Sequence, residues 1–179
     1  MKRLAILVSC LLPIWSMAQD STWVPVYHPA AGCSWLMPGQ PSMIDTLQVR
    51  MYSLEMDSTL GIAVHFVLGV SPDTAAAGIF KAAWEVEQDT LRAMAQVMLF
   101  VSGAELLAIA DTTVGAVPAL DLTMETSTEG EPEDQVTRLR LIYHDRRFMT
   151  FGVTAPKDRS LDVIALGNAL HGTIQIDQP

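Results

Sequence analysis

Four arginines between residues 138 and 153 are the side chains of this sequence whose type and spacing could bind a ligand. Arg138 and Arg140 stand two residues apart, and Arg146 and Arg147 follow them. Residues two apart in a strand point to the same side of it, so Arg138 and Arg140 would project together. Two guanidinium groups held in this way can bind a carboxylate or a phosphate through paired hydrogen bonds. The candidate ligand-binding residues are therefore Arg138, Arg140 and Arg147.

A structural role for the same arginines is the competing interpretation. Asp121 and Glu125 stand on the segment that we expect to form the neighbouring strand. Opposite charges on adjacent strands form cross-strand pairs, and the chain has twenty acidic residues against eleven lysines and arginines. Because carboxylates are so abundant, we favour pairing within the protein. An exposed anion site on the Arg138/Arg140 face is the alternative.

Sequence motifs for metal binding and catalysis are absent. The four histidines, His28, His65, His144 and His171, show neither the H-x-H nor the H-E-x-x-H spacing of metal ligands. No glycine-rich phosphate loop and no G-x-S-x-G elbow occurs. The acidic residues between 125 and 135 do not follow the spacing of a calcium loop. We therefore expect a protein that is not an enzyme and that has no cofactor and no metal.

The first eighteen residues have the pattern of a signal peptide. Lys2 and Arg3 form a basic start, an apolar run continues to Trp15, and Ser16 and Ala18 supply the small residues of a cleavage site. The apolar run is too short to span a membrane, which takes about 20 residues. We predict cleavage after Ala18, a single domain over residues 19–179, and a periplasmic or extracellular location.

A lipid anchor at Cys10 is the rival interpretation of the leader. The residues Leu7-Val8-Ser9-Cys10 are similar to a bacterial lipobox. The apolar stretch in front of Cys10 is short, however, and apolar residues follow it where a lipoprotein has a polar tether. We therefore expect that Cys10 is not lipidated.

Charge limits the partners that this chain can bind. Removal of Lys2 and Arg3 would change the net charge from −9 to −11. Nucleic acids and anionic membrane surfaces are bound through a cationic footprint. We therefore expect neither as a partner, and we expect an unidentified protein or another envelope component instead.

Cys33 would be the only cysteine left after cleavage, so no internal disulfide can form. No lysine or arginine is close to it in the sequence to lower the pKa of the thiol. We favour a buried side chain that packs as a small apolar group. The alternative is a dimer linked through Cys33.

The elements that must position these residues follow from periodicity. Spacings of three and four residues predict a long helix over 75–100 and a short one over 160–170. Alternation predicts strands at 33–37, 47–56, 61–70, 105–114, 117–126 and 173–176, with two more in a hairpin over 138–153. Short turns join most neighbouring strands, which favours an α+β fold with an antiparallel sheet and helices packed on it.

The turn of the hairpin over 138–153 decides which residues lie behind the arginines. A two-residue turn at His144 and Asp145 puts Met149 and Phe151 there. A three-residue turn that includes Arg146 instead gathers the apolar residues on the opposite face, namely Leu139, Leu141, Met149, Phe151 and Val153. We favour the three-residue turn, because it separates polar from apolar side chains.

Three stretches together resemble the PsbP-like family of small exported bacterial proteins, a fold shared with a Ran-binding nuclear import protein. They are Cys33-Ser-Trp-Leu-Met-Pro-Gly-Gln-Pro41, the Gly115-centred hairpin with Val117-Pro-Ala-Leu-Asp-Leu122, and Arg146-Arg-Phe148. Cys33 and Phe148 depart from the family, which has an aromatic residue and a tyrosine there. The resemblance implies an α-β-α sandwich on an antiparallel sheet and implies no catalytic residues. Photosynthetic members assist an oxygen-evolving complex, but no residue here matches such a contact.

The sequence thus predicts an exported, non-catalytic domain that binds a protein or assists an assembly of the cell envelope. The alternative is a small-molecule or anion-binding protein that uses the Arg138/Arg140 face of the hairpin.

Overall fold

A computed structural model describes residues 23–45, 50–57, 62–68, 87–127, 133–145 and 147–177 of the chain. Seven of its strands form one antiparallel sheet in the order β3-β4-β5-β9-β8-β7-β6. The strands are β3 (Ser42–Asp45), β4 (Arg50–Asp57), β5 (Ile62–Leu68), β6 (Glu105–Val114), β7 (Val117–Thr126), β8 (Gln135–His144) and β9 (Arg147–Pro156). The predicted α+β class and antiparallel sheet are confirmed.

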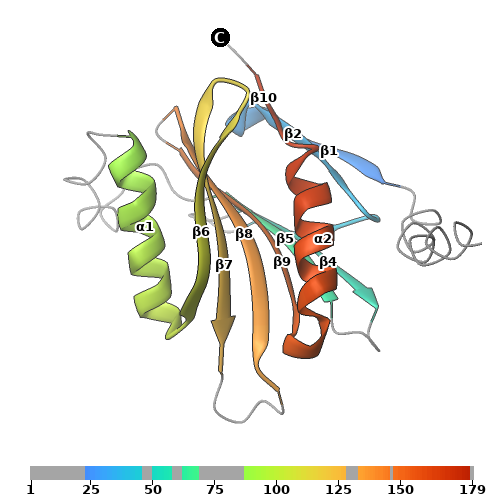
Figure 1. The fold of residues 1–179 in the computed structure, drawn as a ribbon. Coiled ribbons are helices and arrows are strands. Elements are labelled where there is room, and N and C mark those ends of the chain that lie inside the picture. The colour runs from blue at the N-terminus through green and yellow to red at the C-terminus, as the bar shows by residue number, and fades with distance from the viewer. Residues whose placement is uncertain are drawn as a thin grey trace, which may run out of the picture.

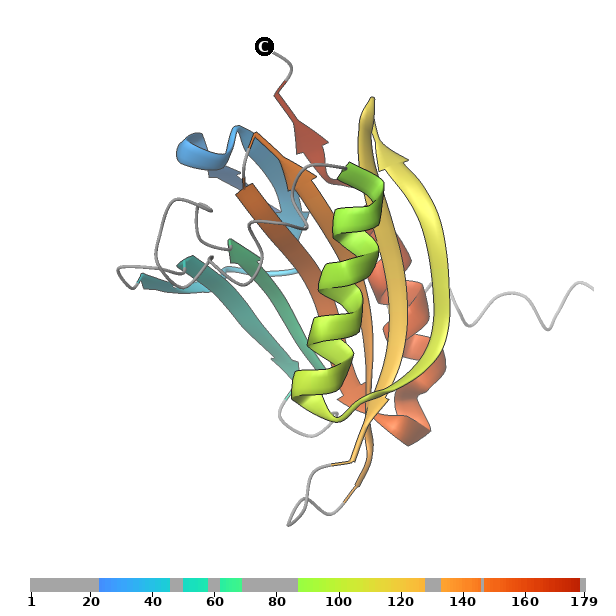
Figure 2. The ribbon, with the colours of Figure 1, turned by 90° about the vertical axis from the view of Figure 1, so that its left-hand side faces the viewer.

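Two helices cover opposite faces of this sheet (Figures 1 and 2). Helix α1 (Glu87–Ser102) packs over β7 and β8. Helix α2 (Ser160–His171) packs over β8 and β9 on the other side, after the 3-10 turn η4 (Lys157–Arg159). The sheet is therefore the middle layer of an α-β-α sandwich.

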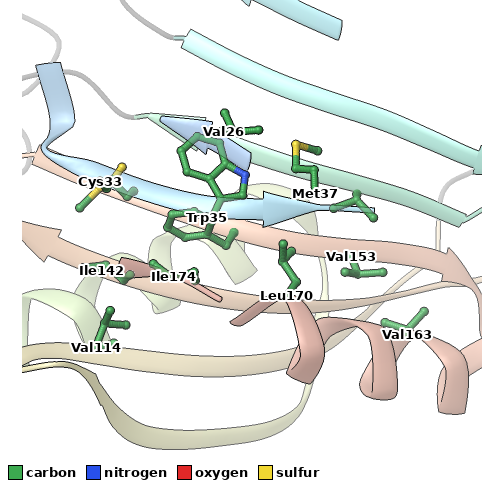
Figure 3. Close-up of a cluster of buried hydrophobic side chains, with 14 of the residues drawn as sticks. Val26, Cys33, Trp35, Met37, Val114, Ile142, Val153, Val163, Leu170 and Ile174 are labelled. Carbon is green, nitrogen blue, oxygen red and sulfur yellow. The ribbon is translucent and has the colours of Figure 1, made fainter. Parts of the chain in front are cut away.

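A second, three-stranded sheet shares the α2 side of the large sheet. It has the order β1-β2-β10, with β1 (Val24–His28), β2 (Cys33–Met37) and β10 (Gln175–Ile176), and the 3-10 turn η1 (Pro29–Ala31) joins its first two strands. Trp35 on β2 lies edge-on to Phe151 on β9, with ring centroids 5.4 Å apart. Figure 3 shows Trp35 among the other side chains of this core. The small sheet is thus packed onto the large one through apolar contacts.

The apolar core is divided by the sheet into two clusters. The α1 cluster joins the helix to β7, β8 and β9 and consists of Leu91, Ala95, Leu120, Leu122, Met124, Leu139, Leu141, Tyr143 and Phe148. The cluster on the other face joins α2 and the small sheet to the large one, and it includes Trp35, Ile142, Met149, Phe151, Val153, Val163 and Leu170. Because both faces are covered, neither face of the central strands is exposed to water.

The hairpin turn differs from the three-residue turn that we favoured. His144 pairs with Arg147, which leaves positions 145 and 146 between the strands, so the turn also lies one residue later than the alternative at His144 and Asp145. Asp145, the first of them, has a φ angle of 47°. Aspartate tolerates this left-handed conformation better than most residues, and two-residue hairpin turns require it.

The two-residue turn also changes which side chains share a face. Arg140 is opposite Phe151 and Arg138 is opposite Val153, so the arginines lie on an apolar face. Leu139 and Leu141 point to the α1 side instead. The expected single apolar face was wrong, because helices cover both sides of the sheet and both therefore carry apolar residues.

The other elements lie where they were predicted, except that the strand expected at 173–176 is limited to β10 (Gln175–Ile176). The strands at 33–37, 105–114 and 117–126 have the predicted bounds. Strands β1 and β3 were not predicted. The predicted signal peptide at 1–18, Cys10, and residues 75–86 of the long helix lie outside the described residues.

Candidate functional site

Strand β8 places Arg138 and Arg140 beneath helix α2. Their register partners on β7 are Thr123 and Asp121. The side chains of Arg138 and Arg140 are only 15% and 13% exposed, and that of Asp121 is 10% exposed. The arginines therefore lie largely between the sheet and the helix.

Asp121 accepts hydrogen bonds from both arginines. Arg140 donates from Nε to Oδ1 at 2.7 Å and from Nη2 to Oδ2 at 2.9 Å. Arg138 donates from Nη2 to Oδ2 at 3.0 Å and from Nη1 to the Thr123 hydroxyl at 3.2 Å. A planar guanidinium group matches a carboxylate in this two-point geometry. The predicted pairing of the arginines with Asp121 is confirmed.

Helix α2 completes the cluster from above. Arg140 Nη1 donates to the carbonyl oxygen of His171 at 3.1 Å, and Arg138 Nη2 contacts Asn168 Oδ1 at 3.4 Å. A cation at the last carbonyls of a helix is favoured by the helix dipole. Gly167 allows the close approach, because a Cβ atom there would lie 2.6 Å from Arg138 Cγ. The cluster thus fixes α2 on the sheet.

His171 is the fourth ionisable member of the cluster, and its side chain is 1% exposed. Its Nε2 lies 3.1 Å from the carbonyl oxygen of Phe151, which can only accept, so Nε2 carries the proton. Nδ1 lies 3.7 Å from Asp121 Oδ1. Burial, followed by the charge of Arg140, lowers the pKa of His171 to about 4. The imidazole is therefore neutral at physiological pH.

The same arginines set the ionisation of Asp121. Burial raises the pKa of this carboxyl group, but the hydrogen bond and charge of Arg140, with the charge of Arg138, outweigh burial and leave the pKa below its ordinary value. Asp121 is consequently an anion held between two cations. This arrangement can anchor a helix, and it includes no group prepared to transfer a proton near neutral pH.

Arg147 lies apart from the other two candidate residues. It is opposite His144 at the turn, whereas Arg140 is opposite Phe151. The four residues from Arg140 to His144 span about 13 Å at the usual rise of a strand. Arg147 is half-exposed and lies 3.5 Å from Asp145. The structure therefore brings together Arg138 and Arg140 but not Arg147, and ligand binding by the three residues stays a prediction.

Cys33 and His28 are buried at the junction of the two sheets. Cys33 has no exposed surface, and burial raises the pKa of its thiol to about 12. His28 Nδ1 accepts a hydrogen bond from the Ala31 amide at 3.0 Å and so caps η1. Burial, and then the charge of Arg50, lower the pKa of His28. The burial of Cys33 confirms its role as a small apolar side chain and opposes the alternative of a Cys33-linked dimer.

The outer strand β6 has a different environment from every other long strand. Its side chains from Glu105 to Asp111 are all exposed, whereas the middle of β7 beside it is buried. The last turn of α1 adds Phe100 and Val101, which are 87% and 77% exposed. We call this apolar region the α1–β6 surface; it consists of Phe100, Val101, Leu106, Leu107 and Ile109.

Carboxylates gather at the Glu105 end of β6, on the face of the sheet opposite α1. Lys157 contacts Glu125 at 2.5 Å and Asp134 at 3.9 Å. The hydrogen bond to Glu125 raises the pKa of Lys157, and the charges of Glu125, Asp134 and Glu105 add to this effect. One lysine thus stands among three carboxylates, which leaves this end of β6 with an excess of negative charge.

Comparison with solved structures settles the fold. The cyanobacterial PsbP protein CyanoP from Synechocystis sp. PCC 6803 superimposes with a TM-score of 0.60 at 11% sequence identity, covering 88% of this chain and 94% of that one. This chain has the PsbP-like fold. LpqN from Mycobacterium tuberculosis, described as involved in cell envelope biogenesis, gives a TM-score of 0.50 at 12% identity, covering 88% of this chain and 91% of that chain. No protein-family model and no curated protein matches the sequence.

Within this PsbP-like fold, sequence reasoning found the arginine cluster but missed the α1–β6 surface. The clustered arginines stood out because basic residues are scarce in the chain. The sequence pattern predicted only a strand for the segment that contains Leu106, Leu107 and Ile109. The pair Leu106-Leu107 nevertheless breaks strict alternation. That break corresponds to a β-bulge between Leu106 and Ala108.

The described part of this PsbP-like domain contains no group of three His, Cys, Asp or Glu side chains placed to hold a metal ion. Within the same residues, no helix is both long and apolar enough to cross a membrane.

Proposed function

We propose that this chain is an exported, non-catalytic domain of the cell envelope that binds another protein through the α1–β6 surface. The observation that carries the proposal is the exposure of its five apolar side chains on two consecutive elements. Exposed apolar groups gathered in one place are typical of interaction surfaces on otherwise soluble domains.

Export is proposed on the pattern of residues 1–18. The likeness of the fold to LpqN, which is described as involved in cell envelope biogenesis, supports an envelope role. The absence of a catalytic role is proposed because the buried ionisable groups beneath α2 bind one another and anchor the helix. Phosphate loops and nucleophile elbows are also missing from the sequence.

Site-specific crosslinking in the native cell tests this function. A photo-crosslinking phenylalanine analogue would replace Phe100 in one strain and Leu161 in another. Leu161 is the matched control, because it is an 80% exposed apolar residue on α2, on the opposite face of the sheet. We expect a discrete protein adduct from position 100 and none from position 161.

The proposal fails if position 100 gives no adduct above the background of position 161. It also fails if both positions give the same set of adducts, because the contact would then be unspecific.

A further inference from the structure

We propose that the partner of the α1–β6 surface is an extended segment of another protein, which adds as a strand to the outer edge of β6 and carries apolar and basic side chains. This inference rests on the proposed function and names the chemistry of its partner.

The backbone of β6 provides the first step. β6 is ten residues long and stands at the end of the strand order β3-β4-β5-β9-β8-β7-β6. Among the described residues, no strand pairs with its outer side, as Figure 2 shows for the yellow strand at the rim of the sheet. An outer strand presents a row of N–H and C=O groups to which a further strand can bond.

The register of β6 defines the stretch that can accept a strand. The register with β7 shifts between Leu106 and Ala108, and it is regular from Ala108 to Val114. Seven residues in regular register match the usual length of a strand. We therefore expect the added strand to pair with Ala108–Val114 and to end at the bulge.

Side chains at the bulge supply an apolar anchor for one end of such a strand. Leu107, the extra residue of the bulge, is 49% exposed. Leu106 and Ile109 are opposite Met124 and Leu122, so they lie on the α1 face of the sheet. The added strand can thus bury apolar side chains on the same face as Phe100, whereas the opposite face of β6 offers the small side chains of Ala108 and Ala110.

Charge distinguishes a basic partner from a second copy of this chain. On β6 itself, Asp111 is paired with Arg92 at 2.6 Å, so that charge is already neutralised. At the end of β6 near Glu105, one lysine, Lys157, stands among three carboxylates, so the charge there stays negative. A segment with lysine or arginine at one end complements these carboxylates, whereas a second copy of the exported chain would carry a net charge of −11 and repel them.

Selection of random ten-residue peptides displayed on phage against the full chain tests the inference. We expect enriched peptides with β-branched and apolar residues in alternation and with lysine or arginine near one end. Their synthetic versions should shift the amide NMR resonances of Ala108–Val114. Methylation of alternate peptide nitrogens should abolish binding, because it removes the backbone donors that pair with the edge.

Variants of the chain complete the test. The double variant Leu107→Ser with Ile109→Ser should bind the selected peptides at least about tenfold more weakly. Leu161→Ser, at an exposed leucine on the opposite face, should bind them like the unchanged protein.

Three results would overturn the inference. The first is enrichment of no peptide, or of peptides without basic residues. The second is equal binding by the methylated peptides, or resonance shifts outside β6. The third is sedimentation of the full chain as a dimer with protected β6 amides, which would assign the edge to a second copy. A crosslinked partner at position 100 would leave the proposed function standing in each case.

Discussion

Gly167 on α2 lies directly against the side chain of Arg138 on β8. A Cβ atom at position 167 would be 2.6 Å from Arg138 Cγ and 3.0 Å from its Cβ. The missing side chain of one residue thus makes room for the methylene stem of the other, and the guanidinium group of Arg138 can reach Asp121 under the helix.

Replacement of Gly167 by alanine should destabilise the protein. Alanine in a helix is ordinarily favoured over glycine by about 1 kcal/mol, but here the added methyl group displaces α2 from the sheet. We expect the free energy of unfolding in urea to fall by about 1–3 kcal/mol. The matched control is Gly172→Ala, whose Cβ would meet its nearest atoms at 3.5 Å. Equal stability of the two variants would contradict the close contact.

Replacement of Asp121 by asparagine should cost more than replacement of an exposed aspartate. The change leaves two largely buried guanidinium groups without their anion, and we expect a loss of about 3 kcal/mol in the free energy of unfolding. The control is Asp111→Asn, because the Arg92–Asp111 bridge is half-exposed and should contribute less than about 1 kcal/mol. Similar losses of unfolding free energy in both variants would show that the ion pairs under α2 contribute no more stability than the Arg92–Asp111 bridge.

Acid should destabilise the fold through His171. Its pKa is about 4 in the folded protein against 6.5 when unperturbed. Above pH 6.5 the imidazole is neutral in both the folded and the unfolded chain, so it contributes nothing to the pH dependence of stability. As the pH falls from 6.5 to 4, the unfolded chain binds a proton that the folded chain does not, so stability decreases by up to about 3 kcal/mol.

Unfolding in urea across this pH range measures the contribution of His171. The difference in stability between the unchanged protein and His171→Asn should vary with pH in that window and become constant below pH 4. His144→Asn serves as the control outside the cluster. A pH dependence that His171→Asn leaves unchanged would rule out this explanation.

The Cys33 thiol should be inert in the native protein. It has no exposed surface, and its pKa of about 12 leaves almost no thiolate at neutral pH. We expect iodoacetamide to label Cys33 only after unfolding in urea, with the extent of labelling read by mass spectrometry. Labelling of the folded chain at the rate of the unfolded one would show that β2 opens readily.

Turn chemistry explains which elements could be predicted from the sequence. The strands at 105–114 and 117–126 have the predicted bounds because Gly103 and Gly115 adopt left-handed φ angles of 64° and 59° at their ends. Strand β1 was missed because Pro25 argues against a central strand, and β1 is in fact the outer strand of the small sheet, where proline is tolerated.

The sequence could not predict which side chains of the β8–β9 hairpin point to α1 and which point to α2. Alternation identifies the buried side only when the other side is exposed to water. Leu141 faces α1 and Met149 faces α2, and both are fully buried. The pairing of Arg140 with Asp121 was predictable from opposite charge on adjacent strands, whereas the exposure of β6 depends on where α1 lies.

The pairing of β2 with β10 has a consequence for how the chain reaches this structure. Cys33 is opposite Ile176, so two strands that are far apart in the sequence meet. A contact between such distant residues has a high loop-closure cost and is made late in folding. While the chain is being synthesised, β2 can pair with β1, but the three-stranded sheet stays incomplete until Gln175 and Ile176 have left the ribosome. We expect the amino-terminal strands to be the part of the nascent chain that chaperones can hold longest.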